Sequence, residues 1–591
     1  MSANDYEPSE ETHSTETIFT PLDGDLYQIR ILHLSAASDK EHVIECHISV
    51  ISLDDPGLQY EALSYVWGDR DNDQMITLEG QPWRVTANLF RALQHLRHTD
   101  RPRSLWVDAV CINQEDTDER GHQVSHMGPI FRKAETVVIW LGEAWPGVND
   151  AFRFFTIAGQ ISELHVNRVL SPSLAGQGVD AESERVIRAL KHFASFAWWG
   201  RMWTVQEMVL AQHPIFQCGR SVLDGDLMLQ AVRGIFEHNG CCVLGGSQST
   251  VAAFAALTHC FRAPVTILLL RSNLRNEGDP SSNNILPIVT LLRGHDSKDP
   301  RDKIYGKIAL AAAEASRLSL LSDYHQGTED LYTKLALSFI LNTRELKVFM
   351  CILPRPHVLH LPSWVPDWTI PIDLDRDLLA WHTRMRYSGI YKTHRLKPAD
   401  CVVGRNITSL KIAGIIVDSV KQIVATPGPY RRRIPTLLKV AQSWPQPEGT
   451  RCIDHSPPRE SPALTLCGSS IGSERVHSFR ELSFFDQWVT WMTSSPFEMM
   501  FPNQEVAQFD YSVSLTSKGR SFMFSEGNRM GWVPENTTVG DVIAVFTGSG
   551  APVALRPRED GYIVIGTAYV HGIMDGEAMP DDAELSYITF I

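Results

Sequence analysis

The segment LWVDAVCINQEDTDERGHQVSHMGPIFRKAETVVIWLG, residues 105–142, constrains the fold of this chain more than any other. It consists of an apolar run, a polar turn, an amphipathic helical stretch and a second apolar run. A helix between two apolar strands is the usual connection in a parallel sheet, whose strands are covered on both faces. We therefore expect two buried parallel strands, 105–112 and 136–141, joined by a helix.

The limits of this helix can be predicted from its capping residues. Asp116 can cap the first turn, and Glu119 three residues later completes a capping signal. Pro129 lies inside the helical stretch and predicts a kink. The apolar stripe of the helix consists of Val124, Met127, Ile130 and Ala134.

Three earlier segments extend the sheet. LYQIRILHL (26–34) and HVIECHISVISL (42–53) alternate apolar and polar positions, which is typical of antiparallel strands. YEALSYVWG (60–68) is a more buried strand, and Thr86 can cap a helix that leads to residue 105; Leu89, Leu93 and Leu96 form its apolar stripe. Strands that alternate with helices of this length predict an α/β fold with a doubly wound, flavodoxin-like parallel sheet and flanking helices.

The rest of the chain divides by composition. We expect a disordered acidic tail at 1–20, the α/β domain at 21–215, a mainly helical region at 216–375, a mixed α/β segment at 376–442, a Pro/Ser-rich linker or loop at 443–478, and a β-rich region at 479–591. Short β-branched and aromatic runs between Gly and Pro turns near the end predict a small antiparallel barrel or sheet.

Charge and cysteine usage indicate the class of protein. A formal net charge of -15 argues against a nucleic-acid-binding protein, and 10 cysteines without CxxC pairs indicate reduced thiols in a cytoplasmic protein. The N-terminus is acidic where a signal peptide would be basic and apolar. The most apolar stretch, 251–270, is interrupted by His259, Arg262 and Pro264, so we expect a core helix and no membrane span.

Polar residues gather at the exits of two predicted strands and on a later helix. Asp69 and Arg70 follow the first strand, Asp108, Asn113 and Gln114 mark the second, and Trp203 and Glu207 lie one helical turn apart. A carboxylate beside an aromatic ring at the carboxyl edge of a sheet suits a nucleotide or a sugar. The carboxylate can accept hydrogen bonds from ribose hydroxyls and can stabilise an oxocarbenium-like centre. The alternative is structural: the tryptophans are core aromatics, Glu207 pairs with Arg201, and Asp108 pins the following turn.

Two short motifs match catalytic or metal patterns only in part. GSSIG (468–472) fits GxSxG with Ser470 as the nucleophile of a serine hydrolase, but its Pro/Ser-rich surroundings lack the buried strand and helix of a nucleophile elbow. His122 and His126 are four residues apart, yet Gln123 stands where an HExxH metal site requires glutamate. We expect two exposed histidines and no metal site.

Three blocks of this sequence resemble the signature blocks of the fungal heterokaryon incompatibility (HET) domain. In order, they are YEALSYVWGD (60–69), the segment 105–142, and WWGRMWTVQE (198–207). DPRDKIYG (299–306) and LPSWVPDWT (361–369) are similar to segments that follow this domain in long filamentous-fungal proteins. The departures are Phe131 where Tyr is usual, Ala197 where Pro often stands, and Lys307 where the family is apolar.

The resemblance implies non-self recognition when incompatible hyphae fuse, with regulated cell death as the outcome, an incompatibility partner protein, and self-association through the domain. HET domains are also held to be distant relatives of TIR domains, some of which cleave NAD with a glutamate four residues after a tryptophan. The resemblance thus implies NAD or a related nucleotide as substrate, no required cofactor, and Glu207 as the catalytic residue. Its implied ligand contacts are Trp67, Gly68, Asp69, Arg70, Asp108, Asn113, Gln114 and Trp203. A non-catalytic signalling or assembly module of the same family is the alternative, because many TIR domains act only as scaffolds.

Overall fold

The computed structural model describes residues 18–23, 27–39, 42–68, 72–161, 164–166, 174, 176, 179–237, 248–275, 284–354, 358–371, 390–395, 397–404, 407–424, 460–471, 474–479, 483–493 and 503–591. The chain forms two compact units, which are described separately. Unit 1 takes its residues from Met1–Ile285, His295–Ser316 and Leu321–Tyr324. Unit 2 takes its residues from Leu286–Gly294, Arg317–Leu320 and His325–Ile591.

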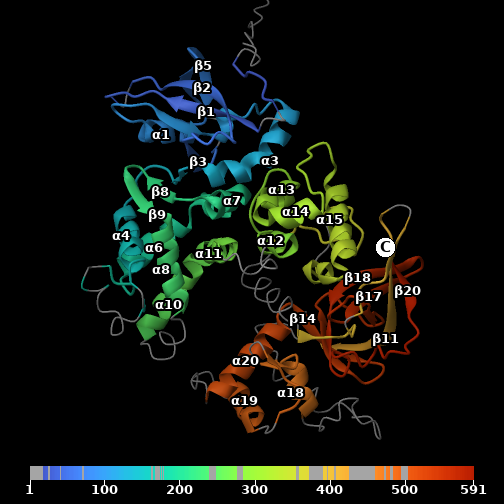
Figure 1. Cartoon of the computed structure of the whole chain (residues 1–591). Helices are drawn as coiled ribbons and strands as arrows, with labels where there is room; N and C mark the ends of the chain where they lie inside the picture. Colours follow the sequence, from blue (N-terminus) through green and yellow to red (C-terminus); the bar gives the residue numbers. More distant parts are fainter. Residues whose placement is uncertain are drawn as a thin grey trace, which may run out of the picture. The chain divides into compact units, whose positions relative to one another are not determined.

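Unit 1 is built on a nine-stranded sheet in the order β5-β4-β2-β1-β6-β3-β7-β8-β9 (Figure 1). The central strands β6, β3, β7 and β8 are parallel, while β1 pairs antiparallel with both β2 and β6. The strands are β1 (Gln28–Leu34), β2 (Glu45–Ser52), β3 (Glu61–Tyr65), β4 (Gln74–Leu78), β5 (Gln81–Val85), β6 (Arg103–Trp106), β7 (Thr136–Trp140), β8 (Pro214–Cys218) and β9 (Ser221–Asp224). The predicted parallel core and the two preceding antiparallel strands are confirmed; the β4–β5 hairpin and the pair β8–β9 were not predicted.

The apolar run 105–112 is not a single strand, and the prediction was wrong here. β6 ends at Trp106, and Asp108–Cys111 form a one-turn helix, α2. Asp108 Oδ1 accepts a hydrogen bond from the backbone N–H of Ala109 at 2.8 Å, and the N–H of Cys111 donates to Val107 O at 2.7 Å. An aspartate that bonds the backbone next to it competes with strand pairing, so the sheet reaches its carboxyl edge before Asp108.

Two helices of unit 1 begin where the sequence predicts. Thr86 caps α1 (Ala87–Leu96) by accepting a hydrogen bond from the N–H of Leu89, and Asp116 caps α3 (Thr117–Lys133) in the same manner. Pro129 lies inside α3. The predicted apolar stripes are buried except at Val124, which is half-buried.

The other described helices of unit 1 follow β7 and β9. They are α4 (Val148–Ala158), α6 (Glu184–Ala194), η4 (Ala197–Gly200), α7 (Met202–Leu210), α8 (Gly225–Glu237), α10 (Gln248–Cys260), α11 (Arg262–Arg275), α13 (Asp302–Ile308), η6 (Ala309–Ala311) and α14 (Ala312–Arg317). In the described part of the chain, no single helix is long and apolar enough to cross a membrane, although the bent pair Ala252–Cys260 and Arg262–Leu274 passes that test when the two are taken together.

Unit 2 contains a β-rich part in which a long strand, β11 (Leu410–Val424), pairs in turn with β10, β20, β16 and β14 (Figure 1). Because β16, β17, β18 and β20 are themselves joined in that order, the additional pairing of β16 with β11 closes a ring of strands. This closure confirms the predicted barrel-like end of the chain. The other strands are β10 (Cys401–Val403), β12 (Ser470–Ile471), β13 (Glu474–Arg475), β14 (Arg520–Ser525), β15 (Met530–Pro534), β16 (Val542–Phe546), β17 (Val553–Arg558), β18 (Gly561–Thr567), β19 (Tyr569–Val570) and β20 (Ser586–Phe590).

The helices of unit 2 include one in the stretch predicted to be a linker. They are α12 (Ile285–Leu291), α15 (Thr328–Thr343), η7 (Lys347–Cys351), α18 (Glu460–Leu466), α19 (Ser483–Thr493) and α20 (Gln504–Ser517). Within 443–478, residues 443–459 lie outside the described residues, but α18 is a helix that buries Ala463 and Leu466 against Trp488 and Phe509. The Pro and Ser residues around the apolar part of α18 led to the prediction of a linker, although this helix packs in the core.

Candidate functional site

Glu207 of α7 lies against the carboxyl end of β3. The Ser64 hydroxyl, in β3, donates a hydrogen bond to Glu207 Oε2, and Trp198 Nε1 donates to Ser64 Oγ at 2.8 Å. The Arg201 guanidinium donates to Tyr65 O at 2.8 Å. The segment from η4 to α7 is therefore attached to the last two residues of β3.

Burial dominates the chemistry of Glu207, whose exposed fraction is 6%. Removal from water raises the pKa of Glu207 to about 7. The hydrogen bond from Ser64 and the charge of Arg201 oppose this rise, and the charge of Asp108 adds to it. The carboxyl group therefore exchanges its proton near neutral pH, as a general acid or base must.

Asp108 connects the exits of β3 and β6. Its Oδ2 accepts a hydrogen bond from Trp67 Nε1 at 2.7 Å, and its backbone carbonyl accepts one from Gln114 Nε2 at 2.9 Å. Burial raises the pKa of Asp108, while the bond from Trp67 lowers it. Asp108 thus fixes the Trp67 indole and, as the structural alternative proposed, the turn that follows β6.

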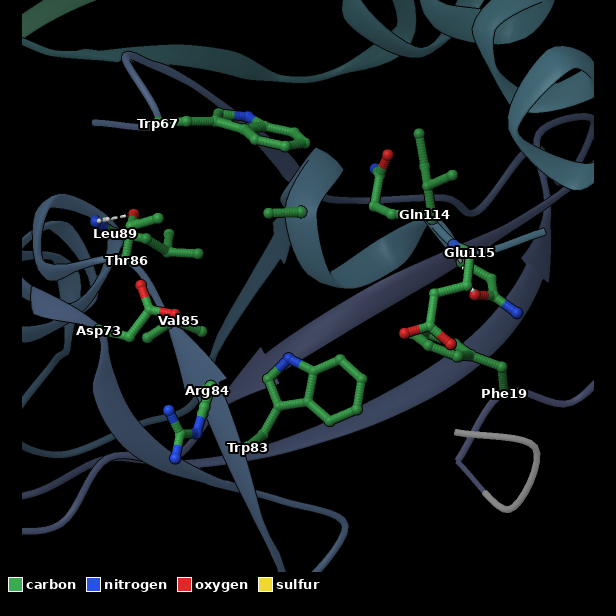
Figure 2. Close-up of a pocket in the computed structure, with 13 residues that line it drawn as sticks. Phe19, Trp67, Asp73, Trp83, Arg84, Val85, Thr86, Leu89, Gln114 and Glu115 are labelled. Atoms are coloured by element: carbon green, nitrogen blue, oxygen red, sulfur yellow. Dashed lines mark hydrogen bonds between the residues drawn. The ribbon is translucent and has the colours of Figure 1, made fainter. Parts of the chain in front are cut away.

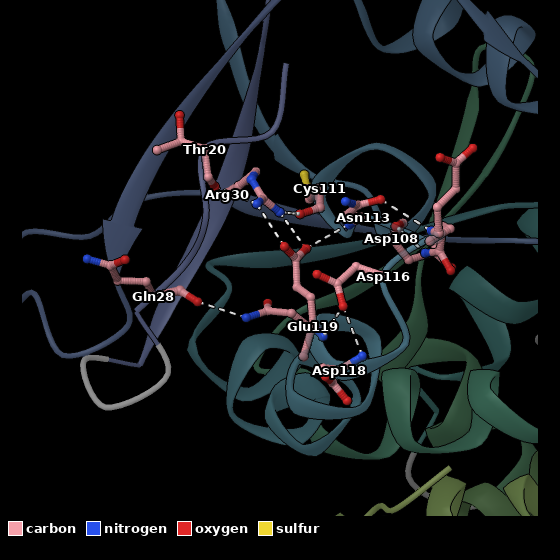
Figure 3. Close-up of polar contacts among 12 residues, drawn as sticks. Thr20, Gln28, Arg30, Asp108, Cys111, Asn113, Asp116, Asp118 and Glu119 are labelled. Carbon is pink, nitrogen blue, oxygen red and sulfur yellow. Dashed lines mark hydrogen bonds and ion pairs between the residues drawn. The ribbon is translucent and has the colours of Figure 1, made fainter. Parts of the chain in front are cut away.

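An ion pair between Arg30 and Glu119 holds this turn from the other side (Figure 3). Arg30 in β1, whose exposed fraction is 1%, donates to both carboxylate oxygens of Glu119, at 2.6 and 2.9 Å. Arg30 also donates to the carbonyl of Cys111, and Glu119 Oε1 accepts from the backbone N–H of Asn113 at 2.7 Å. The Asn113–Gln114 turn is therefore clamped between β1 and α3 before any ligand binds.

An open pocket of about 420 Å³ lies beside this turn (Figure 2). It is formed by the exit of β3, the β4–β5 hairpin, the start of α1, the 112–115 turn and the segment before β1. Its lining consists of Phe19, Trp67, Asp73, Trp83, Arg84, Val85, Thr86, Leu89, Ala109, Ile112, Asn113, Gln114 and Glu115. Trp67, Asn113 and Gln114 are thus brought together as predicted for one site, whereas Phe19, Asp73, Trp83 and Arg84 were missed, because nothing in the sequence marks a hairpin edge as a pocket wall.

The other predicted contacts lie elsewhere. Asp108 and Glu207 are outside the pocket lining, although Asp108 bonds the Trp67 indole that lines it. Gly68 has a φ of +78°, which suits glycine in the turn after β3. Asp69 and Arg70 lie outside the described residues.

Trp203 belongs to a different set of contacts. Its Nε1 donates to Asp302 Oδ2 at 3.2 Å, and the Tyr324 hydroxyl donates to Asp302 Oδ1 at 2.7 Å. Gly306 of α13 also lies next to Trp203, since an added Cβ atom would be in ordinary van der Waals contact with the ring at 3.6 Å. The Trp203 indole therefore packs on α13, and its N–H donates to Asp302 and not to Glu207 or Ser64.

Among the described residues, neither partial motif has the arrangement of the catalytic or metal site that it matches in part. Ser470 follows α18 rather than a strand, and its buried hydroxyl donates to Cys467 O at 3.2 Å, so the strand-turn-helix arrangement of a nucleophile elbow is absent there. His126 is buried, which contradicts its predicted exposure; burial lowers the pKa of His126 to about 4 because its ring packs against Tyr27 and His122. Among the described residues, no group of three or more His, Cys, Asp or Glu could hold a metal ion.

Comparison with known proteins places this site in a recognised domain. Residues 60–207 match the model of the family "Heterokaryon incompatibility protein (HET)". This segment is therefore similar to a HET domain. Residues 495–587 match the model of the Het-6 beta-barrel domain, the region in which the ring of strands closes.

The similarity to one known protein extends well beyond the HET domain. Heterokaryon incompatibility protein 6, OR allele, of Neurospora crassa is 25% identical to this chain over an alignment of 676 positions. The alignment covers 94% of this chain and 95% of that protein. No solved structure matches the chain significantly. The matched HET domain begins at Tyr60 and ends at Glu207, yet Phe19, Arg30 and Asp302, which shape or support the site, lie outside it.

Proposed function

We propose that this protein acts in fungal non-self recognition, as a heterokaryon incompatibility protein whose engagement with an incompatible partner leads to regulated cell death. The observation that carries the proposal is that this chain matches the models of the HET domain and of the Het-6 barrel domain. Its alignment with Heterokaryon incompatibility protein 6 of Neurospora crassa also covers 94% of this chain and 95% of that protein. The site of action is the cytoplasm, and the trigger is a partner protein or self-association of the HET domain.

Controlled expression in a filamentous fungus tests this role. The gene is placed under an inducible promoter and introduced into a panel of strains that differ in their incompatibility genotype. We expect growth arrest and uptake of a vital dye after induction or hyphal fusion in some genotypes but not in others. Equal growth and viability in every genotype would contradict the role.

We further propose that the HET domain hydrolyses NAD. Water would replace nicotinamide at C1′ of its ribose, giving nicotinamide, ADP-ribose and a proton. The Glu207 carboxylate would stabilise the oxocarbenium-like centre and accept the proton of the attacking water. Two observations favour this chemistry: Glu207 has a pKa of about 7 beside the carboxyl end of β3, and the parallel strands follow the order second-first-third-fourth, which is the order at the start of a flavodoxin-like sheet.

A non-catalytic assembly module is the second candidate, and one observation favours it. Glu207 is nearly fully buried and lies outside the lining of the open pocket, so a substrate reaches it only after α7 or Trp67 moves. In this case Glu207 links α7 to Ser64 of β3 and keeps the domain in one conformation.

Nicotinamide release separates the two candidates. Concentrated full-length protein is assayed with NAD between about pH 5 and pH 9, and the wild type is compared with Glu207→Gln and with Glu135→Gln, whose side chain is exposed. The enzyme hypothesis predicts a rate that rises through about pH 7 as Glu207 ionises, is retained by Glu135→Gln and is lost in Glu207→Gln. If all three proteins release nicotinamide only at the background rate, and Glu207→Gln still causes cell death in the fungus, the enzyme hypothesis is excluded. The assembly module is then supported.

A further inference from the structure

The open pocket of unit 1 has two indole walls that are already fixed in place. Trp67 and Trp83 lie on opposite sides of the cavity (Figure 2). Trp67 is held by its hydrogen bond to Asp108, and Trp83 packs edge-on against Phe19 with ring centroids 5.7 Å apart. These two described indoles make no ring contact with each other. An indole that is held in the wall of a cavity is suited to a planar ring that stacks on it.

Asp73, which precedes β4, and Arg84 of β5 are two charged groups that line the same cavity. Asp73 Oδ1 is buried and has no hydrogen-bond partner among the described residues. Arg84 is exposed at the rim and forms no ion pair with any described residue, although Asp73 also lines the pocket. A buried carboxylate oxygen without a donor is costly, so a ligand that supplies a hydroxyl or amino group would remove that cost.

We propose that this pocket binds a nucleoside monophosphate unit, either free or as half of a dinucleotide. The base stacks between Trp67 and Trp83, a ribose hydroxyl or a base amino group donates to Asp73, and the phosphate accepts from Arg84. One arginine against the two carboxylates Asp73 and Glu115 suits a single phosphate better than a chain of phosphates. The volume of about 420 Å³ falls in the range of small-ligand pockets.

The Asn113–Gln114 turn supports this assignment, since its position does not depend on the ligand. Glu119 holds the backbone of Asn113, and Asp108 holds the side-chain amide nitrogen of Gln114. Because these hydrogen bonds already hold the turn, it loses little conformational entropy when a ligand binds. The pocket is distinct from Glu207, so this inference does not depend on NAD hydrolysis.

Isothermal titration calorimetry of the full-length protein tests the proposal with 5′-AMP, adenosine, ribose 5-phosphate and NAD. Arg84→Gln removes the phosphate contact, and Arg91→Gln on the exposed face of α1 is its charge-matched control. Trp83→Ala removes one stacking wall, while Trp83→Phe keeps an aromatic ring there. Thermal melting of every variant verifies that it is folded.

We expect saturable binding of AMP. Arg84→Gln should weaken AMP about tenfold and leave adenosine within about twofold, because only the phosphate contact is lost. Trp83→Ala should weaken both by at least about fivefold, and Trp83→Phe should retain most of the affinity. Tighter binding of NAD than of AMP assigns the unit to a dinucleotide, and the reverse assigns it to a free nucleotide.

Three results would overturn the proposal. They are no saturable heat with AMP or NAD at millimolar concentration, equal weakening by Arg84→Gln and Arg91→Gln, and ribose 5-phosphate binding as tightly as AMP. AMP binding without nicotinamide release would support the pocket while removing the hydrolase hypothesis, so the two can fail separately.

Discussion

Protonation of Glu207 links the candidate site to the stability of the fold. Burial raises the pKa of Glu207 from 4.5 to about 7, so folding favours the protonated form. The stabilising contribution of this group is complete below about pH 4.5 and is lost as the pH rises through about 7. Glu207→Gln stays neutral and can still accept the hydrogen bond from Ser64. We expect this variant to match the wild type near pH 4.5 and to exceed its free energy of unfolding at pH 8 by about 3 kcal/mol.

Urea unfolding at the two pH values measures this difference. Glu135→Gln, which removes an exposed carboxylate from the same unit, should change the free energy of unfolding by no more than about 0.5 kcal/mol at either pH. A Glu207→Gln protein that is less stable than the wild type at pH 8 would mean that the Glu207 charge is compensated in the fold.

Single residues also show where sequence reasoning stops. Glu119 was predicted from its spacing to complete the capping signal of Asp116, and Asp116 does cap α3. The carboxylate of Glu119, however, binds Arg30 of β1 and the N–H of Asn113. The partner of Glu119 is 89 residues away in the sequence. Local patterns predict which residues cap a helix, but a buried ion pair between distant elements depends on the tertiary fold.

At the scale of elements, the buried strands β3 and β7 were predicted, whereas the β4–β5 hairpin was not. β3 and β7 are buried strands because their Val, Leu, Ile and Ala side chains are covered on both faces. No strand was predicted in the hairpin of β4 and β5, yet the hairpin supplies Trp83 and Arg84 to the pocket. The hairpin is stabilised because β4 pairs with β2. This pairing cannot be predicted from the local sequence of the hairpin.

Helix α3 offers a matched test of element packing, because it contains two glycines in different surroundings. A Cβ atom on Gly128 would lie 2.5 Å from the Cβ atom of Ala309, whereas one on Gly121 would meet its nearest atom at 3.6 Å. We expect Gly128→Ala to destabilise unit 1 by about 1–3 kcal/mol through overpacking. Gly121→Ala should be neutral or stabilise by up to about 1 kcal/mol, since alanine favours the helix.

Thermal and urea unfolding of both variants gives the comparison. Equal effects of the two substitutions would mean that α3 and η6 separate easily, and that the close approach at Gly128 does not contribute to stability.

At the scale of the whole molecule, the closed ring of strands in unit 2 and the sheet of unit 1 differ in how far the sequence predicts them. The strands of the C-terminal region were expected from their β-branched runs, but the closure depends on β11, whose register shifts between Ile416 and Asp418 as it pairs with β16. A bulge of this kind lets one strand pair with several partners, and a sequence pattern of period two does not reveal it.

The sheet of unit 1 leads to a prediction about domain limits. The family match 60–207 includes β6 and β7 but excludes β1 and β8, the strands that pair with their outer edges. It also excludes Arg30, the ion-pair partner of Glu119. We expect a fragment of residues 60–207 to aggregate, because the edges of two apolar strands, β6 and β7, are uncovered. A fragment of residues 18–237 restores all nine strands and should remain soluble and folded. Size-exclusion chromatography and far-UV circular dichroism compare the two fragments, and a monodisperse, folded 60–207 fragment would show that the HET domain does not need the strands that flank it here.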